Sequence, residues 1–199
     1  PTASGKTNLA IEIAEKLKID IHNIDSRQLY VGMNIGTAKP TLDQQKRVKH
    51  FLLNICPPNQ QITLHEFQKK AQLSLQESLH KKNIGLLVGG SGLYLKALTN
   101  GLMPPSVPPQ KTLRDQLRKI DKNQCHQMLE LCDPMTARKV SPSDSIRTIR
   151  ALEVFYATGQ PMSSQKSCNP PSWEIVEIGL DPIDLEERIK HRTQEMYEN

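Results

Sequence analysis

The chain has 199 residues, of which 37% are hydrophobic and 24% charged, and this is enough to bury one good core. We expect one domain with an insertion. No apolar run approaches the roughly 20 residues that a membrane-spanning helix needs, and no signal peptide is visible. These features argue against a membrane protein, and we expect a soluble, cytoplasmic monomer that makes no membrane contact.

The formal net charge is +5, and the basic excess is concentrated in one stretch. Residues 111 to 150 hold nine Lys or Arg against five Asp or Glu. A local surplus of positive charge is typical of surfaces that contact a polyanion. This stretch is therefore the predicted region of contact with such a partner.

The four cysteines fall at irregular spacings, and no two of them form a C-x-x-C pair: Cys56, Cys125, Cys132 and Cys168. Neither a zinc site nor a disulfide framework is indicated by this spacing. We expect reduced thiols.

The first seven residues, Pro-Thr-Ala-Ser-Gly-Lys-Thr, match three of the four specified positions of a phosphate-binding loop, or P-loop. Backbone N–H groups of such a loop close around phosphate oxygens, and the N-terminus of the following helix adds partial positive charge. Lys6 supplies a full charge, and Thr7 can ligate Mg²⁺. The motif does not identify the phosphate compound, since ATP, GTP and a prenyl diphosphate offer the same oxygens.

The leading glycine of the motif is missing, and the chain opens at Pro1 without the buried strand that normally precedes a P-loop. We therefore expect a chain trimmed at its front, whose sheet lacks its first strand.

The segments that follow alternate between helix and strand patterns. Apolar positions in 9–17 recur every three or four residues, as in an amphipathic helix, whereas 19–24 alternates like a strand. A second helical pattern covers 67–79, and the buried strand pattern of 84–88 stops at a glycine pair. This order predicts an α/β fold with a parallel sheet flanked by helices.

Active groups in such folds collect beyond the carboxyl ends of the strands. The P-loop, Asp25 and the Gly-Gly-Ser-Gly turn at 89–92 all occupy that position in the predicted sheet. We expect these turns to converge on one crevice.

The proline-rich segment 104–109 interrupts the pattern, because proline suits neither helix interiors nor sheet ladders. We place a domain boundary there, with the α/β core in 1–103 and an all-helical insertion in 104–172. Residues 173–199 are expected to return to the core, through a strand at 173–180 and a last helix at 184–198.

The roles of single residues stay open at this point. Asp25 fits a metal ligand, a general base or a helix N-cap. Ser91 offers a hydroxyl to a phosphate or a reacting amine, although a plain strand-to-helix turn explains its setting equally well. Arg147 and Arg150 share one helical face, which suits gripping neighbouring nucleic-acid phosphates or an unstacked base. A solvated face paired with Asp144 and Glu153 explains the same spacing. Arg192 falls on the apolar stripe of the last helix and needs an anion there, unless its side chain extends to solvent.

Five stretches together resemble one family, the tRNA dimethylallyltransferases, also called tRNA isopentenyltransferases. They are Pro-Thr-Ala-Ser-Gly-Lys-Thr at 1–7, Asp-Ser-Arg-Gln-Leu-Tyr at 25–30, Gly-Met-Asn-Ile-Gly-Thr-Ala-Lys-Pro at 32–40, Leu-Val-Gly-Gly-Ser-Gly-Leu-Tyr-Leu-Lys-Ala-Leu at 87–98 and Arg-Thr-Ile-Arg-Ala-Leu-Glu-Val at 147–154. The resemblance covers most of the chain. It implies a P-loop NTPase-like sheet with a helical tRNA-binding insertion.

The resemblance implies transfer of a dimethylallyl group from dimethylallyl diphosphate to the exocyclic N6 amine of the adenine 3′ of the tRNA anticodon, with Mg²⁺ on the diphosphate. The P-loop would then hold a leaving group rather than a nucleotide, and the target base would be flipped out of the anticodon stem-loop.

The resemblance also assigns roles to residues. It implies catalytic roles for Asp25, as general base, and for Ser91 and Arg192. The diphosphate would contact Pro1, Thr2, Ala3, Ser4, Gly5, Lys6, Thr7 and Arg188, and Thr7 would ligate the metal. The tRNA would contact Asp25, Ser26, Arg27, Gln28, Arg114, Ile146, Arg147, Thr148, Ile149 and Arg150.

The chain departs from the family pattern in several places. Ser91 stands where the family usually has threonine, and His50-Phe51 replaces a usual His-His pair. The strand before Pro1 and the helices beyond residue 199 are absent, which we expect to remove part of the substrate channel. The alternatives are an enzyme that prenylates free adenine nucleotides to make cytokinins, a P-loop kinase, and a non-catalytic RNA-binding module.

Overall fold

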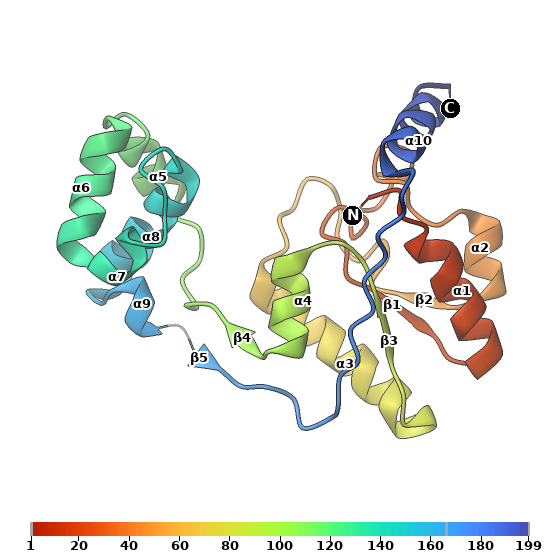
Figure 1. Cartoon of the computed structure of the whole chain (residues 1–199). Coiled ribbons are helices and arrows are strands. Elements are labelled where there is room, and N and C mark those ends of the chain that lie inside the picture. The colour runs from red at the N-terminus through yellow and green to blue at the C-terminus, as the bar shows by residue number, and fades with distance from the viewer. Residues whose placement is uncertain (1, 166, 199) are drawn as a thin grey trace. The chain divides into compact units, whose positions relative to one another are not determined.

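The structure is a computed structural model that describes residues 2–165 and 167–198. The chain divides into two compact units (Figure 1). Unit 1 comprises Pro1–Gly101 and Pro170–Asn199, and unit 2 comprises Leu102–Asn169. The predicted insertion, 104–172, overlaps almost all of unit 2.

Unit 1 is built on a three-stranded parallel sheet in the order β2-β1-β3, formed by His50–Phe51, Ile21–Asn23 and Leu86–Val88. The helices described in this unit are α1 (Lys6–Leu17), α2 (Leu42–Arg47), α3 (Leu64–Lys82), α4 (Gly92–Thr99) and α10 (Leu185–Glu198). The predicted parallel α/β class is confirmed, and the expected helices and strands at 6–24 and 67–88 form with shorter strands than the patterns suggested.

Helices cover both faces of this sheet. Successive strand residues point to opposite sides, so the apolar residues of β3 need packing partners on both. Leu86 and Val88 pack with Ala10, Ile11 and Ala14 of α1. Leu87, between them, packs on the other face with α3 and α4, in a cluster that contains Ile24, Leu29, Phe67, Ala71 and Leu98. The sheet is therefore the middle layer of unit 1.

His22 links β1 to α3 inside this layer. Its ring is fully buried, stacks on Phe51 at 4.9 Å, and contacts the hydroxyl groups of Ser74 at 3.0 Å and Ser78 at 2.9 Å. Burial lowers the pKa of His22 to about 4. The ring is thus neutral at physiological pH, and the contact stabilises unit 1 most fully above the ordinary histidine pKa.

The residues that follow β1 and β3 lie in close backbone contact. A Cβ atom on Gly89 would lie 2.6 Å from the backbone C and O atoms of Ile24, a distance that real Cβ atoms essentially never show. Gly89 is therefore required for the backbone after β3 to pass the end of β1.

We expect Gly89→Ala to destabilise the protein by about 3 kcal/mol, because the added methyl group meets backbone that cannot rotate away. Gly90→Ala is the matched control, since nothing lies within 4 Å of its Cβ position. Thermal unfolding followed by circular dichroism measures both. Equal melting temperatures for the two variants would contradict the close approach.

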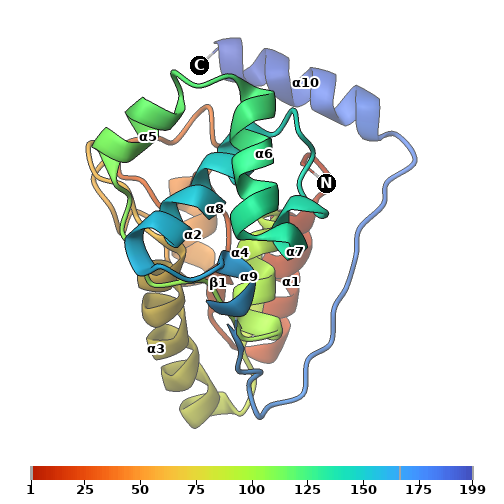
Figure 2. The same cartoon turned by 90° about the vertical axis from the view of Figure 1, so that its left-hand side faces the viewer.

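Unit 2 consists mainly of helices: α5 (Lys111–Leu117), α6 (Lys122–Cys132), α7 (Pro134–Ala137), α8 (Ser145–Thr158) and α9 (Met162–Gln165). Figure 2 shows these helices from a second side. Their core contains Leu117, Cys125, Leu129, Ile149 and Leu152. A short antiparallel pair joins β4 (Leu102–Met103) to β5 (Ser167–Cys168), where the chain enters and leaves the unit. The insertion is thus helical apart from this ribbon.

Glu153 of α8 is fully buried and anchors the start of unit 2. Arg114 donates to both of its carboxylate oxygens at 2.7 and 2.8 Å, the Gln110 amide donates at 2.6 Å, and Arg150 donates at 2.5 Å. Arg150 also donates to the carbonyl oxygens of Pro105 and Val107. The proline-rich entry segment is therefore fastened to α8 by Arg150, and the start of α5 is fastened to it by Glu153.

Burial by itself would raise the pKa of Glu153, but the hydrogen bonds from Arg114, Gln110 and Arg150 outweigh it and hold the pKa at about 2, against an ordinary 4.5. A carboxyl whose pKa is depressed on folding stabilises the fold above its unfolded pKa. This stabilisation is lost as the pH falls from about 4.5 to about 2.

We expect Glu153→Gln to cost about 3 kcal/mol at pH 7, because it leaves two half-buried guanidinium groups without their buried anion. The difference from the parent protein should shrink as the pH falls from 5 toward 2. Urea unfolding across this range measures it, with Asp115→Asn, which removes an exposed ion pair to Arg118, as a control that costs under about 1 kcal/mol. A difference that does not change with pH would contradict the assignment.

The expected strand at 173–180 is wrong. Among the described residues of this segment none is in a strand. Its apolar side chains are exposed, with Val176 at 86% and Ile178 at 71%. An alternating pattern forms a strand only where a partner strand supplies its hydrogen bonds, and here none does.

The expected core stripe of the last helix is also wrong. α10 forms at almost the predicted bounds, but no described residue of this helix is buried, and Ile189 is 37% exposed. Its first turn carries Glu186 and Glu187, which favour a helix N-terminus. Arg192 therefore faces no apolar core. In the part of the chain that the structure describes, no helix is both long enough and apolar enough to cross a membrane.

Candidate functional site

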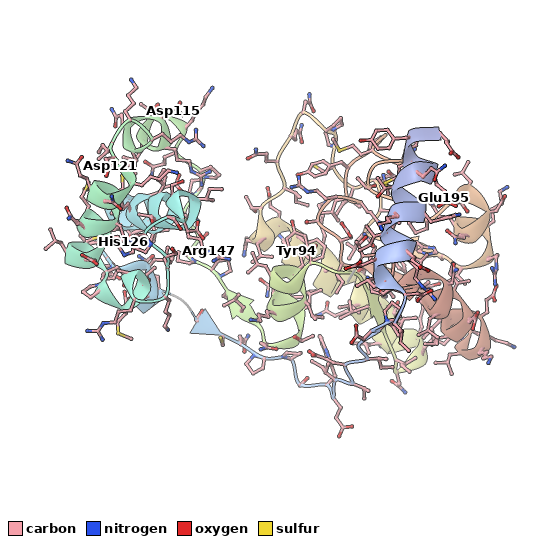
Figure 3. All side chains as sticks on the ribbon, turned by 45° about the horizontal axis from the view of Figure 1, so that its top comes forward. Tyr94, Asp115, Asp121, His126, Arg147 and Glu195 are labelled. Atoms are coloured by element: carbon pink, nitrogen blue, oxygen red, sulfur yellow. The ribbon has the colours of Figure 1, made fainter. Side chains whose placement is uncertain are left out.

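A pocket of about 1440 Å³ opens in unit 1 beyond the carboxyl ends of the strands. The P-loop residues 2–7, the turn at 25–28, the turn at 89–91, the loop at 34–42 and one side of α10 line it. Figure 3 labels Glu195 on that helix. The convergence of the P-loop, Asp25 and the glycine turn on one crevice, expected from the strand order, is confirmed.

The P-loop turns sharply before α1. Ala3 and Gly5 both have positive φ, 56° and 85°, and the helix begins at Lys6. The left-handed conformation at Gly5 suits glycine, and it leads the backbone into the first helical turn. Lys6 donates to the Ser4 hydroxyl at 3.2 Å. Thr2 to Thr7 line the pocket, while Pro1 lies outside the described residues.

Positive charge gathers around this loop from a distant part of the chain. Arg192 of α10 donates to the Thr2 hydroxyl at 3.3 Å, and a Cβ atom on Gly5 would lie 3.8 Å from Nη1 of Arg188. Arg188 is also paired with Asp184 at 2.7 Å. Burial lowers the pKa of Lys6, the charge of Arg192 lowers it further, and Asp25 opposes both. An anion with several oxygens would relieve the repulsion among these cations.

Asp25 and Ser91 stand on neighbouring turns of the pocket wall. One carboxylate oxygen of Asp25 accepts a hydrogen bond from the Arg27 amide at 2.8 Å, so Asp25 orders the turn that follows β1. The Ser91 hydroxyl accepts from the Ser26 amide at 2.9 Å and donates to the Ser26 hydroxyl at 3.2 Å. The two turns are thus tied together beside the P-loop.

Sequence reasoning gave no role to Lys39, which is 8% exposed and lies in the pocket wall. Its ammonium donates to the Tyr30 carbonyl and to the Asn54 side chain, each at 2.6 Å. Gln28 donates to the carbonyls of Thr37 and Ala38 at 2.9 and 3.0 Å. These bonds fix the loop at 31–41 over the pocket. Lys39 belongs to the stretch 32–40 that carries the family resemblance, but neither periodicity nor spacing indicates that its ammonium is buried.

The pocket offers oxygen donors suited to Mg²⁺. The Thr7 hydroxyl and the Asp25 carboxylate line the same cavity. Within residues 2–165 and 167–198 no three His, Cys, Asp or Glu side chains gather as a metal site. This donor set fits an ion held largely by the oxygens of a bound diphosphate, with few protein ligands.

The residues expected to contact tRNA divide into two groups. Ser26, Arg27 and Gln28 line the pocket of unit 1. In unit 2, Ile146 and Arg147 are exposed, at 82% and 74%, and Arg147 pairs with Asp144 at 3.2 Å. The other expected residues of unit 2 are ion-paired or buried inside the unit.

Those engaged residues are Arg114 and Arg150, bound to Glu153, and Thr148 and Ile149, which are 1% and 8% exposed. Thr148 and Ile149 belong to the helix face that packs inward, so their side chains are not offered to a ligand. Arg150 forms the ion pair with Glu153 that the sequence offered as an alternative to a nucleic-acid contact. Glu153 is fully buried and Arg150 is half-buried, so the pair does not lie on a solvated face.

The parallel sheet and the P-loop before α1 define a P-loop-type α/β protein, and Lys6, Arg188 and Arg192 gather positive charge at its pocket. A family model described as IPP transferase matches residues 28–199. The chain belongs to this family.

Curated relatives support the membership. A tRNA dimethylallyltransferase of Prochlorococcus marinus is 61% identical over 198 residues, covering 100% of this chain and 66% of the relative. One from Synechococcus is 54% identical over 198 residues, covering 100% of this chain and 64% of the relative. The chain spans about two thirds of the length of the curated relatives it matches.

Solved structures agree. A eukaryotic dimethylallyltransferase acting on tRNA matches with a TM-score of 0.80 at 27% identity, covering 100% of this chain and 51% of that chain. The tRNA isopentenylpyrophosphate transferase of Bacillus halodurans matches with a TM-score of 0.62 at 31% identity, covering 100% of this chain and 64% of that one.

We expect Arg192→Ala and Lys6→Ala each to weaken binding of inorganic pyrophosphate at least about tenfold, since each removes a charge-assisted contact. Lys16→Ala is the matched control, because Lys16 lies on α1 but does not line the pocket. Isothermal titration calorimetry measures the affinities. Pyrophosphate binding that is unchanged in both pocket variants would place the anion elsewhere.

Proposed function

We propose that this protein transfers the dimethylallyl group of dimethylallyl diphosphate to the N6 amine of the adenine 3′ of the tRNA anticodon, giving N6-isopentenyladenosine. The observation that carries the proposal is one pocket in which Lys6, Arg188 and Arg192 surround the P-loop while Asp25 and Ser91 stand on its wall. The names of the relatives indicate the same reaction. We further propose that it acts as a monomer in the cytoplasm.

The cationic side of the pocket suits a leaving group. As the bond between the allylic carbon and the diphosphate oxygen breaks, negative charge builds on the diphosphate. Backbone amides of residues 2–7 and the Lys6 ammonium would stabilise that charge, and Arg188 and Arg192 would clamp the oxygens from α10. Mg²⁺, held by Thr7 and the diphosphate, would supply further neutralisation.

The other side suits the acceptor. The N6 lone pair of adenine is delocalised into the ring, so the amine attacks better when its proton is removed. Asp25 would accept that proton as the new N–C bond forms. The Ser91 hydroxyl, already held against Ser26, would orient the amine or the diphosphate. The base must leave the stack of the anticodon loop to reach this wall.

Contacts with tRNA are proposed at both units. Ser26, Arg27 and Gln28 would meet the flipped base and its neighbours at the pocket, and Ile146 and Arg147 offer exposed side chains on α8. Arg114, Thr148, Ile149 and Arg150 would act mainly by shaping this surface, because their side chains are held within unit 2.

The alternatives fit less well. A kinase would need ATP-dependent phosphorylation of an acceptor, whereas the names of the relatives point to prenyl transfer. An enzyme for free adenine nucleotides would not need the helical insertion, which carries much of the basic excess. A non-catalytic RNA-binding module leaves the cationic pocket without a use.

We expect Asp25→Asn to abolish prenyl transfer while leaving tRNA affinity within about twofold, because a general base acts on the chemical step. Asp43→Asn is the control, since this carboxylate is 88% exposed and does not line the pocket. Single-turnover transfer from labelled dimethylallyl diphosphate measures the rate, and filter binding measures the affinity. Full activity of the Asp25 variant would show that another group accepts the proton.

A further inference from the structure

Unit 2 carries more positive charge than its acidic residues neutralise, and its ion pairs show which cations remain available. Arg114 and Arg150 share the buried carboxylate of Glu153, Arg118 pairs with Asp115, and Arg147 pairs with Asp144. Arg138 and Lys139 are exposed, and neither side chain has an ion pair or hydrogen bond within the described residues. These adjacent cations are free to bind an external anion.

Arg138 and Lys139 also line a depression of about 590 Å³ that lies wholly within unit 2. His126 and Glu130 of α6 and the segment at 140–142 also line it. Figure 3 labels His126 on that helix. The free cations therefore stand at a hollow rather than on a flat surface.

His126 is a buried polar side chain in the wall of this hollow. The residue is only 6% exposed, and its Nε2 atom lies 3.7 Å from the Glu130 carboxylate. Its Nδ1 atom is buried and has no hydrogen-bond partner among the described residues, so it is not offered to a ligand in the hollow.

We propose that this depression binds a phosphate group of the tRNA backbone, with Arg138 and Lys139 as its ligands. A guanidinium beside an ammonium suits a phosphate, and the single acid in the wall, Glu130, leaves a net positive charge. The inference rests on the proposed function, because it takes the anion to be RNA. In this proposal, unit 2 binds the RNA phosphate through Arg138 and Lys139, which follow α7, rather than through Arg114 and Arg150.

The test is salt-dependent binding of unmodified tRNA to the whole chain. Arg138→Gln combined with Lys139→Gln should weaken binding about tenfold at low salt and reduce the slope of log affinity against log salt by about 1. Lys119→Gln combined with Lys122→Gln removes the same charge from exposed positions of unit 2 that do not line the depression. That control should lose no more than about twofold and keep the parent slope. Circular dichroism verifies that both variants stay folded.

The outcomes separate the two proposals. If the parent chain binds tRNA and both double variants weaken it equally, the depression is no specific phosphate site and the proposed function stands. If the parent chain binds no tRNA at any salt concentration, both proposals fail. A loss confined to the Arg138 and Lys139 variant supports the site.

Discussion

The contact of Gly89 with the backbone of Ile24 is the constraint on which the pocket depends. It allows β1 and β3 to end side by side, so that the turns after them lie within hydrogen-bond reach. Ser91 then accepts from the Ser26 amide, and Asp25 orders the same turn through Arg27. A side chain at position 89 would push these turns apart, and the proposed base and hydroxyl would no longer share one wall.

The second determinant is the way charge is distributed across that wall. Lys6, Arg188 and Arg192 come from opposite ends of the chain and line the pocket at the P-loop. Burial and the charge of Arg192 lower the pKa of Lys6, and an anion with several oxygens would relieve that repulsion. In the proposed reaction this pocket would stabilise a departing diphosphate, and the Asp25 carboxylate would take a proton. Charge in unit 2 is also unevenly paired. The fully buried Glu153 neutralises Arg114 and Arg150, whereas Arg138 and Lys139 have no ion pair among the described residues.

Much of unit 1 could be predicted from the sequence, because its signals are local. The helical period after Lys6 and the apolar run before Gly89 each depend on neighbours in the chain, and their order dictated the parallel sheet. The segment at 173–180 was predicted wrongly because a strand needs a partner that periodicity does not supply. The prediction for Arg150 was incomplete for a related reason. Spacing placed Glu153 three residues away, but only the fold showed that this carboxylate is buried and shared with Arg114. Lys39 was missed because nothing in its surroundings marks a lysine whose ammonium is bonded inside a loop.

In the proposed function, one pocket joins a diphosphate donor to an adenine of tRNA. Mass spectrometry of nucleosides from tRNA incubated with the protein, dimethylallyl diphosphate and Mg²⁺ tests this reaction most directly. The expected product is an adenosine that has gained one dimethylallyl group in place of a hydrogen, located immediately 3′ of the anticodon. Unmodified tRNA, together with ATP-dependent phosphorylation of an acceptor by the same protein, would contradict the proposed reaction.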